Sequence, residues 1–171
     1  MKRIILAFLF TVSFLMSAAA AQWQDEGKLN TWTYKTISRA ANYEDLIYLK
    51  HVRIAKGIGY DRLVFEFTGG IPRYLVEPNK KGSFENTAEQ FVKVGGKAFI
   101  EVNLQTLPYP ETEKDDAKIP EGNRHLPIFY EIKEVEWFEG VRDFGIGLNA
   151  RKMFRVQELT NPYRLVIDFK H

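Results

Sequence analysis

Two segments of the chain carry an arginine and an acid at the same four-residue spacing. Arg62 precedes Glu66, and Arg164 precedes Asp168. Residues four apart on a β-strand lie on one face of the sheet, so these side chains can form ion pairs across a sheet surface. Alternatively, the guanidinium groups can donate hydrogen bonds to carboxylate or sugar oxygens of a ligand. The sequence leaves both interpretations open.

The two acids are also candidates for catalysis. A glycosidase needs two carboxylates that flank the scissile bond, and Glu66 and Asp168 are the best-placed pair by position. No acid lies in a context that favours catalysis over charge pairing, so a carboxylate-dependent, glycan-cleaving enzyme is the alternative hypothesis and not the leading one.

Other catalytic chemistry lacks the residues that it requires. The chain has no cysteine, its three histidines are scattered, and Ser38 and Ser83 lie outside any G-x-S-x-G motif. No zinc or calcium motif occurs either. We therefore expect a protein that is not an enzyme and that needs no metal or cofactor.

Aromatic residues form a second group of candidate ligand contacts, because sugar rings are commonly held against such side chains. Tyr163 stands between Pro162 and Arg164, where a fully buried ring is not expected, whereas core packing is the alternative for most of the other aromatic residues. The predicted ligand-binding set combines arginines, acids and aromatic residues: Arg53, Arg62, Glu66, Trp137, Arg155, Tyr163, Arg164 and Asp168.

Apolar residues at every second position predict the strands that position these side chains. Leu63, Phe65 and Phe67 alternate with polar residues and are expected to face the core. Many short strands separated by turns, without a strong helix, predict an all-β fold, namely an antiparallel β-sandwich of about eight strands or a partly open barrel. Alternation or flanking turn residues place the strands near 52–56, 62–67, 73–77, 98–104, 128–138, 141–148, 153–158 and 163–169.

Three local features carry further expectations. Prolines flank segment 73–77, which suits an edge strand, and segment 88–93 is a candidate for a turn of helix. Phe84, Phe91 and Val92 are expected to pin the loop around them to the core. In segment 141–148, Gly145 and Gly147 leave one face nearly bare of side chains, which invites close approach by a neighbouring sheet or a ligand.

The first and last hairpins of the predicted sandwich resemble each other. Residues 52–67 and 154–169 align without gaps, and five of the sixteen positions are identical, including Arg53 with Arg155 and Arg62 with Arg164. Two equivalent hairpins produced by duplication are one explanation. The general similarity of alternating strands is the other.

The N-terminus has the pattern of a secretory signal peptide in residues 1–21. Lys2 and Arg3 precede an apolar run that is too short to span a bilayer, and small residues follow it. We expect an exported protein, periplasmic or secreted, with no stable membrane insertion after cleavage. Removal of the leader would take two basic residues from a chain of net charge +2, so the balanced charge argues against nucleic acid as a partner.

Three longer motifs resemble the AMIN-like domain of exported bacterial proteins. The motifs are VRIAKGIGYDRLVFEFTGGIP from Val52, WFEGVRDFGIGL from Trp137 and FRVQELTNPYRLVIDF from Phe154. This family is related to the AMIN domain found ahead of cell-wall amidases and pilus secretins. The resemblance implies a non-catalytic β-sandwich over residues 47–171, with residues 22–46 as an N-terminal extension. It implies binding to peptidoglycan, to another envelope glycan or to an envelope protein, with a purely structural role as a further alternative.

Overall fold

The computed structural model of the chain describes residues 26–40, 46–105, 117–120 and 126–171. The predicted signal peptide (1–21) lies outside these residues, as does most of the predicted loop between residues 107 and 127. No helix that could cross a membrane is found in the described part of the chain.

All regular elements of the described residues are strands, joined in antiparallel sheets. The predicted all-β class is therefore confirmed. The strands are β1 (Ile37–Arg39), β2 (Tyr48–Lys56), β3 (Tyr60–Thr68), β4 (Arg73–Asn79), β5 (Ser83–Glu85), β6 (Phe91–Lys93), β7 (Ala98–Gln105), β8 (Phe129–Phe138), β9 (Val141–Leu148), β10 (Phe154–Leu159) and β11 (Tyr163–Lys170).

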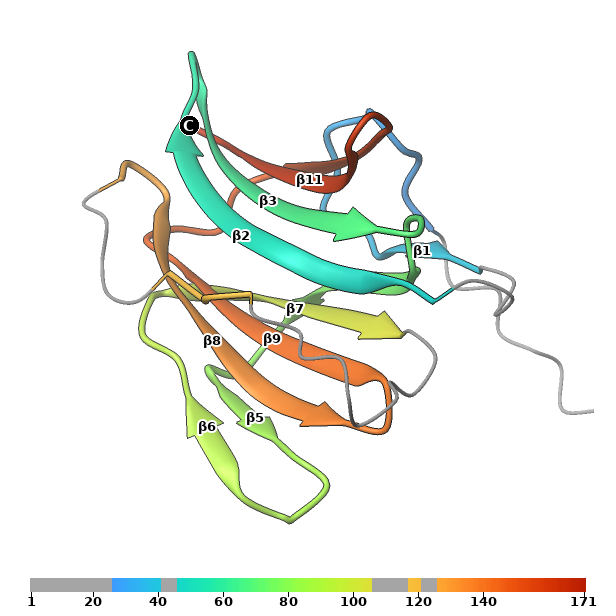
Figure 1. The fold of residues 1–171 in the computed structure, drawn as a ribbon. Helices are drawn as coiled ribbons and strands as arrows, with labels where there is room; N and C mark the ends of the chain where they lie inside the picture. Colours follow the sequence, from blue (N-terminus) through green and yellow to red (C-terminus); the bar gives the residue numbers. More distant parts are fainter. Residues whose placement is uncertain (1–25, 41–45, 106–116, 121–125) are drawn as a thin grey trace, which may run out of the picture.

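Two main sheets face each other as a sandwich, as predicted. One has four strands in the order β10-β11-β3-β2, and the other has five in the order β1-β4-β7-β9-β8. Figure 1 shows β2, β3 and β11 in one layer and β7, β8 and β9 in the other. The short hairpin β5–β6 forms a small sheet of its own. The three strands beyond the predicted eight are β1, β5 and β6, each only three residues long.

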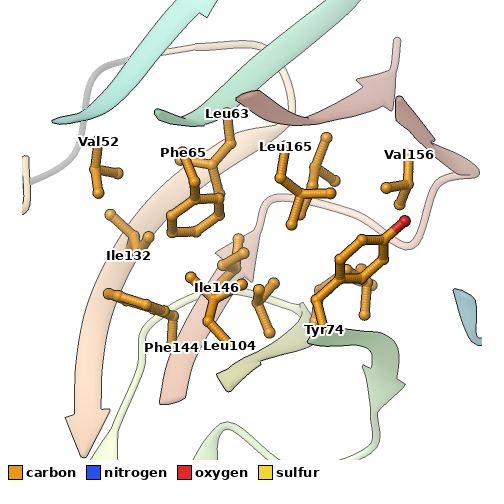
Figure 2. Packing of buried hydrophobic residues seen from close by; sticks show 14 of the residues in the cluster. Val52, Leu63, Phe65, Tyr74, Leu104, Ile132, Phe144, Ile146, Val156 and Leu165 are labelled. Carbon is orange, nitrogen blue, oxygen red and sulfur yellow. The ribbon is translucent and has the colours of Figure 1, made fainter. Parts of the chain in front are cut away.

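The core lies between the two main sheets and is built from their inward-facing apolar side chains. Leu63 and Phe65 of β3 are completely buried, and so are Phe144 and Ile146 of β9. Figure 2 shows these side chains pointing toward one another from the two layers. The rings of Phe65 and Phe144 lie with their centroids 5.1 Å apart. The predicted inward face of residues 63, 65 and 67 is thus confirmed.

The two similar hairpins lie side by side in the four-stranded sheet. Strand β3 pairs with β11 so that Val64 is directly opposite Val166. Because the two strands are antiparallel, this pair is the centre of an approximate two-fold relation that exchanges Arg62 with Arg164. The outer strands β2 and β10 do not follow this relation. Arg155 is opposite Asp168, so symmetry would place Arg53 opposite Glu66, but Arg53 is opposite Val64. The two-fold relation therefore holds for β3 and β11 alone, and duplication of the hairpins stays a prediction.

Three local expectations were wrong. Strand β4 is not at an edge, because β1 pairs with it on the side opposite β7, and the short β1 ends its pairing at Val76, before Pro78. Segment 88–93 holds no helix, since Phe91–Lys93 pairs with β5 as strand β6. In that short hairpin Phe84 and Val92 pack in a second, smaller apolar cluster against the glycine face of β9 and not in the core, whereas Phe91 faces the other way and is 62% exposed.

The glycine face of β9 is covered by the hairpin β5–β6 and by the chain that follows it. A Cβ atom at Gly147 would lie 1.7 Å from the carbonyl oxygen of Gly95, and one at Gly145 would lie 2.7 Å from the ring of Phe84. Only glycine permits this approach. The predicted close contact is therefore confirmed, and a neighbouring part of the chain makes it.

Residues 26–40, here called the N-terminal strap, join the two sheets along one side of the sandwich. Thr33 forms a bridge with Phe154 of β10, and β1 pairs with β4 in the other sheet. Arg39 forms an ion pair with Glu158 of β10, and the Tyr74 hydroxyl of β4 donates to the same carboxylate at 2.8 Å. Burial and the Glu158 carboxylate raise the pKa of Tyr74. The strap is thus packed against both sheets.

Candidate functional site

The candidate site begins with a carboxylate that is fully buried on the outer face of the four-stranded sheet. Asp168 of β11 lies between Arg62 of β3 and Arg155 of β10 in adjacent register positions. Arg62 donates from Nε and Nη2 to the two carboxylate oxygens at 2.6 and 3.0 Å, and Arg155 donates from Nε at 2.9 Å. Hydrogen bonding to Asp168 raises the pKa of Arg62.

Two aromatic rings cover this charged group. The guanidinium of Arg155 lies 4.7 Å from the ring centre of Trp32 and 5.4 Å from that of Tyr60, and Arg62 lies 4.9 Å from Tyr60. Such cation–π contacts gain strength when the cation is partly desolvated. Because its carboxylate already accepts from both arginines, Asp168 has little capacity left to take part in ligand binding.

The other end of the same sheet face carries a looser arrangement. Arg164 lies directly opposite Glu66, yet Glu66 forms its ion pair with Arg53, which reaches it diagonally from β2. The Arg53 side chain is 54% exposed. Arg164 donates from Nε to the carbonyl oxygen of Pro162 at 3.3 Å, and it makes no other hydrogen bond or ion pair with the described residues. Its terminal nitrogen atoms are therefore available to a ligand.

The structure brings together six of the eight residues predicted as ligand contacts. The four arginines, Glu66 and Asp168 share the outer face of one sheet. Tyr163 begins β11 next to Arg164 and is 41% exposed, but its register opposite the buried Phe67 places it on the other face of the strand. Trp137 lies apart from them, on β8 of the five-stranded sheet, where the guanidinium of Arg142 lies 4.7 Å from its ring centre.

Two residues of the site, Tyr60 and Trp32, lie outside the predicted ligand-binding set. Tyr60 stands two positions before Arg62, so strand alternation could have placed both on one face. Trp32 gave no such signal, because its contact with Arg155 joins residues that are far apart in the chain.

The geometry does not favour the glycan-cleaving alternative, in which Glu66 and Asp168 would act on a substrate. A general acid or a nucleophile must reach its substrate, whereas the Asp168 carboxylate is 0% exposed beneath two guanidinium groups. Within the described residues, no group of three His, Cys, Asp or Glu side chains could hold a metal ion. The site has the character of a polar sheet surface with exposed hydrogen-bond donors at one end.

Taken together, the fold and site define a β-sandwich module with an arginine-bearing sheet face. The family model of the AMIN-like domain matches residues 47–171, and the chain belongs to this family. AMIN-like domains are associated with the cell envelope and are generally non-catalytic binding modules. No curated protein and no solved structure matches the chain significantly.

Proposed function

We propose that the chain is an exported, non-catalytic module that binds peptidoglycan or another cell-envelope glycan, or an envelope protein, through the outer face of its four-stranded sheet. The observation that carries this proposal is that the Arg164 guanidinium pairs with no carboxylate of the described residues. This guanidinium lies on an exposed sheet face, opposite a carboxylate that is already paired with Arg53. Membership of the AMIN-like family supports an envelope ligand.

The two ends of the face have different roles in this proposal. Arg62, Arg155 and Asp168 form a closed group that supports the register of β3, β11 and β10. Arg53 and Arg164 present donors for carboxylate or sugar oxygens. Glu66 orients Arg53.

A purely structural role for the whole face is the second candidate. It is favoured by the complete burial of Asp168 and by its three hydrogen bonds from arginines. This candidate expects that substitution of any arginine lowers stability and leaves every binding assay unchanged.

Co-sedimentation with insoluble peptidoglycan tests the proposal. Wild-type protein is expected in the pellet, and the Arg53→Ala/Arg164→Ala variant in the supernatant with an unchanged melting temperature. Lys56→Ala, which removes an exposed cation of the same sheet, is the matched control and should pellet as the wild type does. If all three proteins stay in the supernatant, peptidoglycan is not the ligand, and cross-linking in an envelope extract then tests the protein-partner form.

Two further measurements address export and catalysis. Mass spectrometry of the protein from a periplasmic or culture fraction should give an N-terminus at Gln22. Incubation of the purified protein with peptidoglycan should release no soluble fragments at any pH, and their release would establish the glycan-cleaving alternative.

A further inference from the structure

A small apolar hollow lies at one end of the sandwich, away from the arginine face. It is formed where β4 and β9 end and where β7 and β10 begin, and its volume is about 60 Å³. Apolar side chains contributing to its wall come from both sheets, and they include Ala98, Ile100, Leu148 and Phe154. Because a water molecule needs roughly 10–15 Å³ of such space, the hollow has room for only a few carbon atoms.

Tyr34 of the N-terminal strap forms one side of this hollow. The bridge between Thr33 and Phe154 fixes the strap at this point, and the Tyr34 ring remains 45% exposed. The guanidinium of Arg151 lies 4.8 Å from the centre of that ring. An aromatic side chain and a cation thus stand together at the edge of the hollow.

Two cations line the hollow, and three more stand next to wall residues in the chain. Arg151 and Lys152 contribute to its wall, and Lys97 directly precedes Ala98 of the wall. Lys80 and Lys81 follow Asn79, another wall residue. None of these five cations forms an ion pair with a carboxylate of the described residues. Cations without an ion pair in the wall of an apolar hollow are complementary to a ligand with an anionic head and a short apolar group.

We propose that this hollow binds the C-terminal carboxylate of a peptide that ends in a small apolar residue such as alanine. The methyl group enters the hollow, the carboxylate is held between Arg151 and Lys152, and Tyr34 covers the terminal residue. Arginine binds a carboxylate with two parallel hydrogen bonds, which a neutral terminal amide does not accept in the same way. This site is separate from the arginine face and does not depend on it.

Amide-proton NMR of the whole exported chain, titrated with short acetylated dipeptides, tests the inference. Acetyl-Ala-Ala with a free carboxylate is expected to shift the signals of Ala98, Leu148 and Tyr34. The same dipeptide with a C-terminal amide in place of the carboxylate should shift none of these signals in the same concentration range. Acetyl-Ala-Gly should bind about fourfold more weakly, since it lacks one buried methyl group. Sodium acetate separates a peptide terminus from a free small acid: equal or tighter binding of acetate would overturn the peptide assignment.

Variants localise the site. Ala98→Leu fills the hollow and should abolish the shifts, and Arg151→Gln/Lys152→Gln, which changes no core residue, should abolish them even if Ala98→Leu fails to fold. Lys56→Gln is the matched cation control and should bind as the wild type does. Arg164→Ala should also bind normally, so that failure here is distinguishable from failure of the glycan proposal. Absence of shifts at millimolar dipeptide, or equal binding of the amide, would overturn the inference.

Discussion

Arg62 and Asp168 lie directly opposite each other on β3 and β11, and the arginine donates to both carboxylate oxygens of the buried acid. The symmetry-related pair, Arg164 and Glu66, has the same register but makes no such contact, because Glu66 pairs with Arg53. One pair is closed, and the other leaves a guanidinium available. This difference separates the structural part of the sheet face from the part proposed to bind a ligand.

Replacement of the buried acid should cost far more stability than replacement of its counterpart. Asp168→Asn keeps the shape of the side chain but leaves Arg62 and Arg155 without a counter-charge. We expect a loss of about 3 kcal/mol in the free energy of unfolding, the usual cost of breaking a buried ion pair. Urea denaturation followed by circular dichroism measures it.

Glu66→Gln is the matched control, because it removes the same charge from a pair whose arginine is largely exposed. Such surface pairs contribute at most about 1 kcal/mol. Equal losses for the two variants would show that the closed pair has no special structural role.

The glycine face of β9 gives a prediction about close packing. Gly147→Ala would place a methyl group against the carbonyl oxygen of Gly95, and β9 is a central strand that cannot move away easily. We expect a loss of about 3 kcal/mol, typical of severe overpacking. Thermal unfolding followed by tryptophan fluorescence checks it.

Gly59→Ala provides the comparison. Gly59 has φ +80° and no atom within 4 Å of an added Cβ, so its substitution costs backbone strain alone, about 1 kcal/mol. If Gly147→Ala were no worse than Gly59→Ala, the chain that follows β6 would not be packed tightly on β9.

Local patterns were sufficient to predict most of the sandwich. The alternation at residues 63, 65 and 67 predicted which face of β3 is buried. The predicted strands 128–138 and 141–148 left only Glu139 and Gly140 between them, which is the length of a tight hairpin turn. Both turn residues have positive φ, as that kind of turn requires. These features depend on residues close in the chain, where spacing alone decides the outcome.

Pairings between distant segments could not be predicted in the same way. The sequence predicted ion pairs across a sheet surface as one interpretation. It could not name the partner of Arg62, because that partner is set by the register of β3 against β11, about a hundred residues away. Strand β1 is three residues long and has no alternation to detect. Its existence depends on the exposed edge of β4, which only the assembled sheet provides.

The free energy of unfolding should depend on pH through Glu77, an acid on the outer face of the five-stranded sheet. Burial and the carboxylate of Glu101, directly opposite, raise the pKa of Glu77. The folded state therefore binds this proton more tightly than the unfolded chain. Its stabilising contribution is complete below the ordinary pKa of 4.5 and is lost as the pH rises through the raised pKa.

Glu77→Gln should consequently be more stable than the wild type at pH 7, by less than about 1 kcal/mol, and equally stable at pH 3. Urea denaturation at both pH values measures the difference. Glu85→Gln, which changes an exposed acid opposite Phe91, should give no gain at pH 7. A gain of Glu77→Gln that persisted at pH 3 would contradict the ionisation of the half-buried Glu77 beside Glu101 as its cause.

The N-terminal strap should belong to the stable folding unit, although the family match begins at residue 47. Ile37 of the strap is 1% exposed within the core, and Arg39 pairs with Glu158 of the opposite sheet. A chain that begins at residue 47 would lose both contacts and expose the edge of β4. We expect its free energy of unfolding to be lower by at least about 3 kcal/mol.

Ile37→Ala in the full exported chain should lower the free energy of unfolding by about 2–4 kcal/mol. In this variant β1 remains, but the smaller side chain leaves a cavity in the core. Identical melting temperatures for the chains that begin at residues 22 and 47 would show instead that residues 47–171 fold independently of the strap.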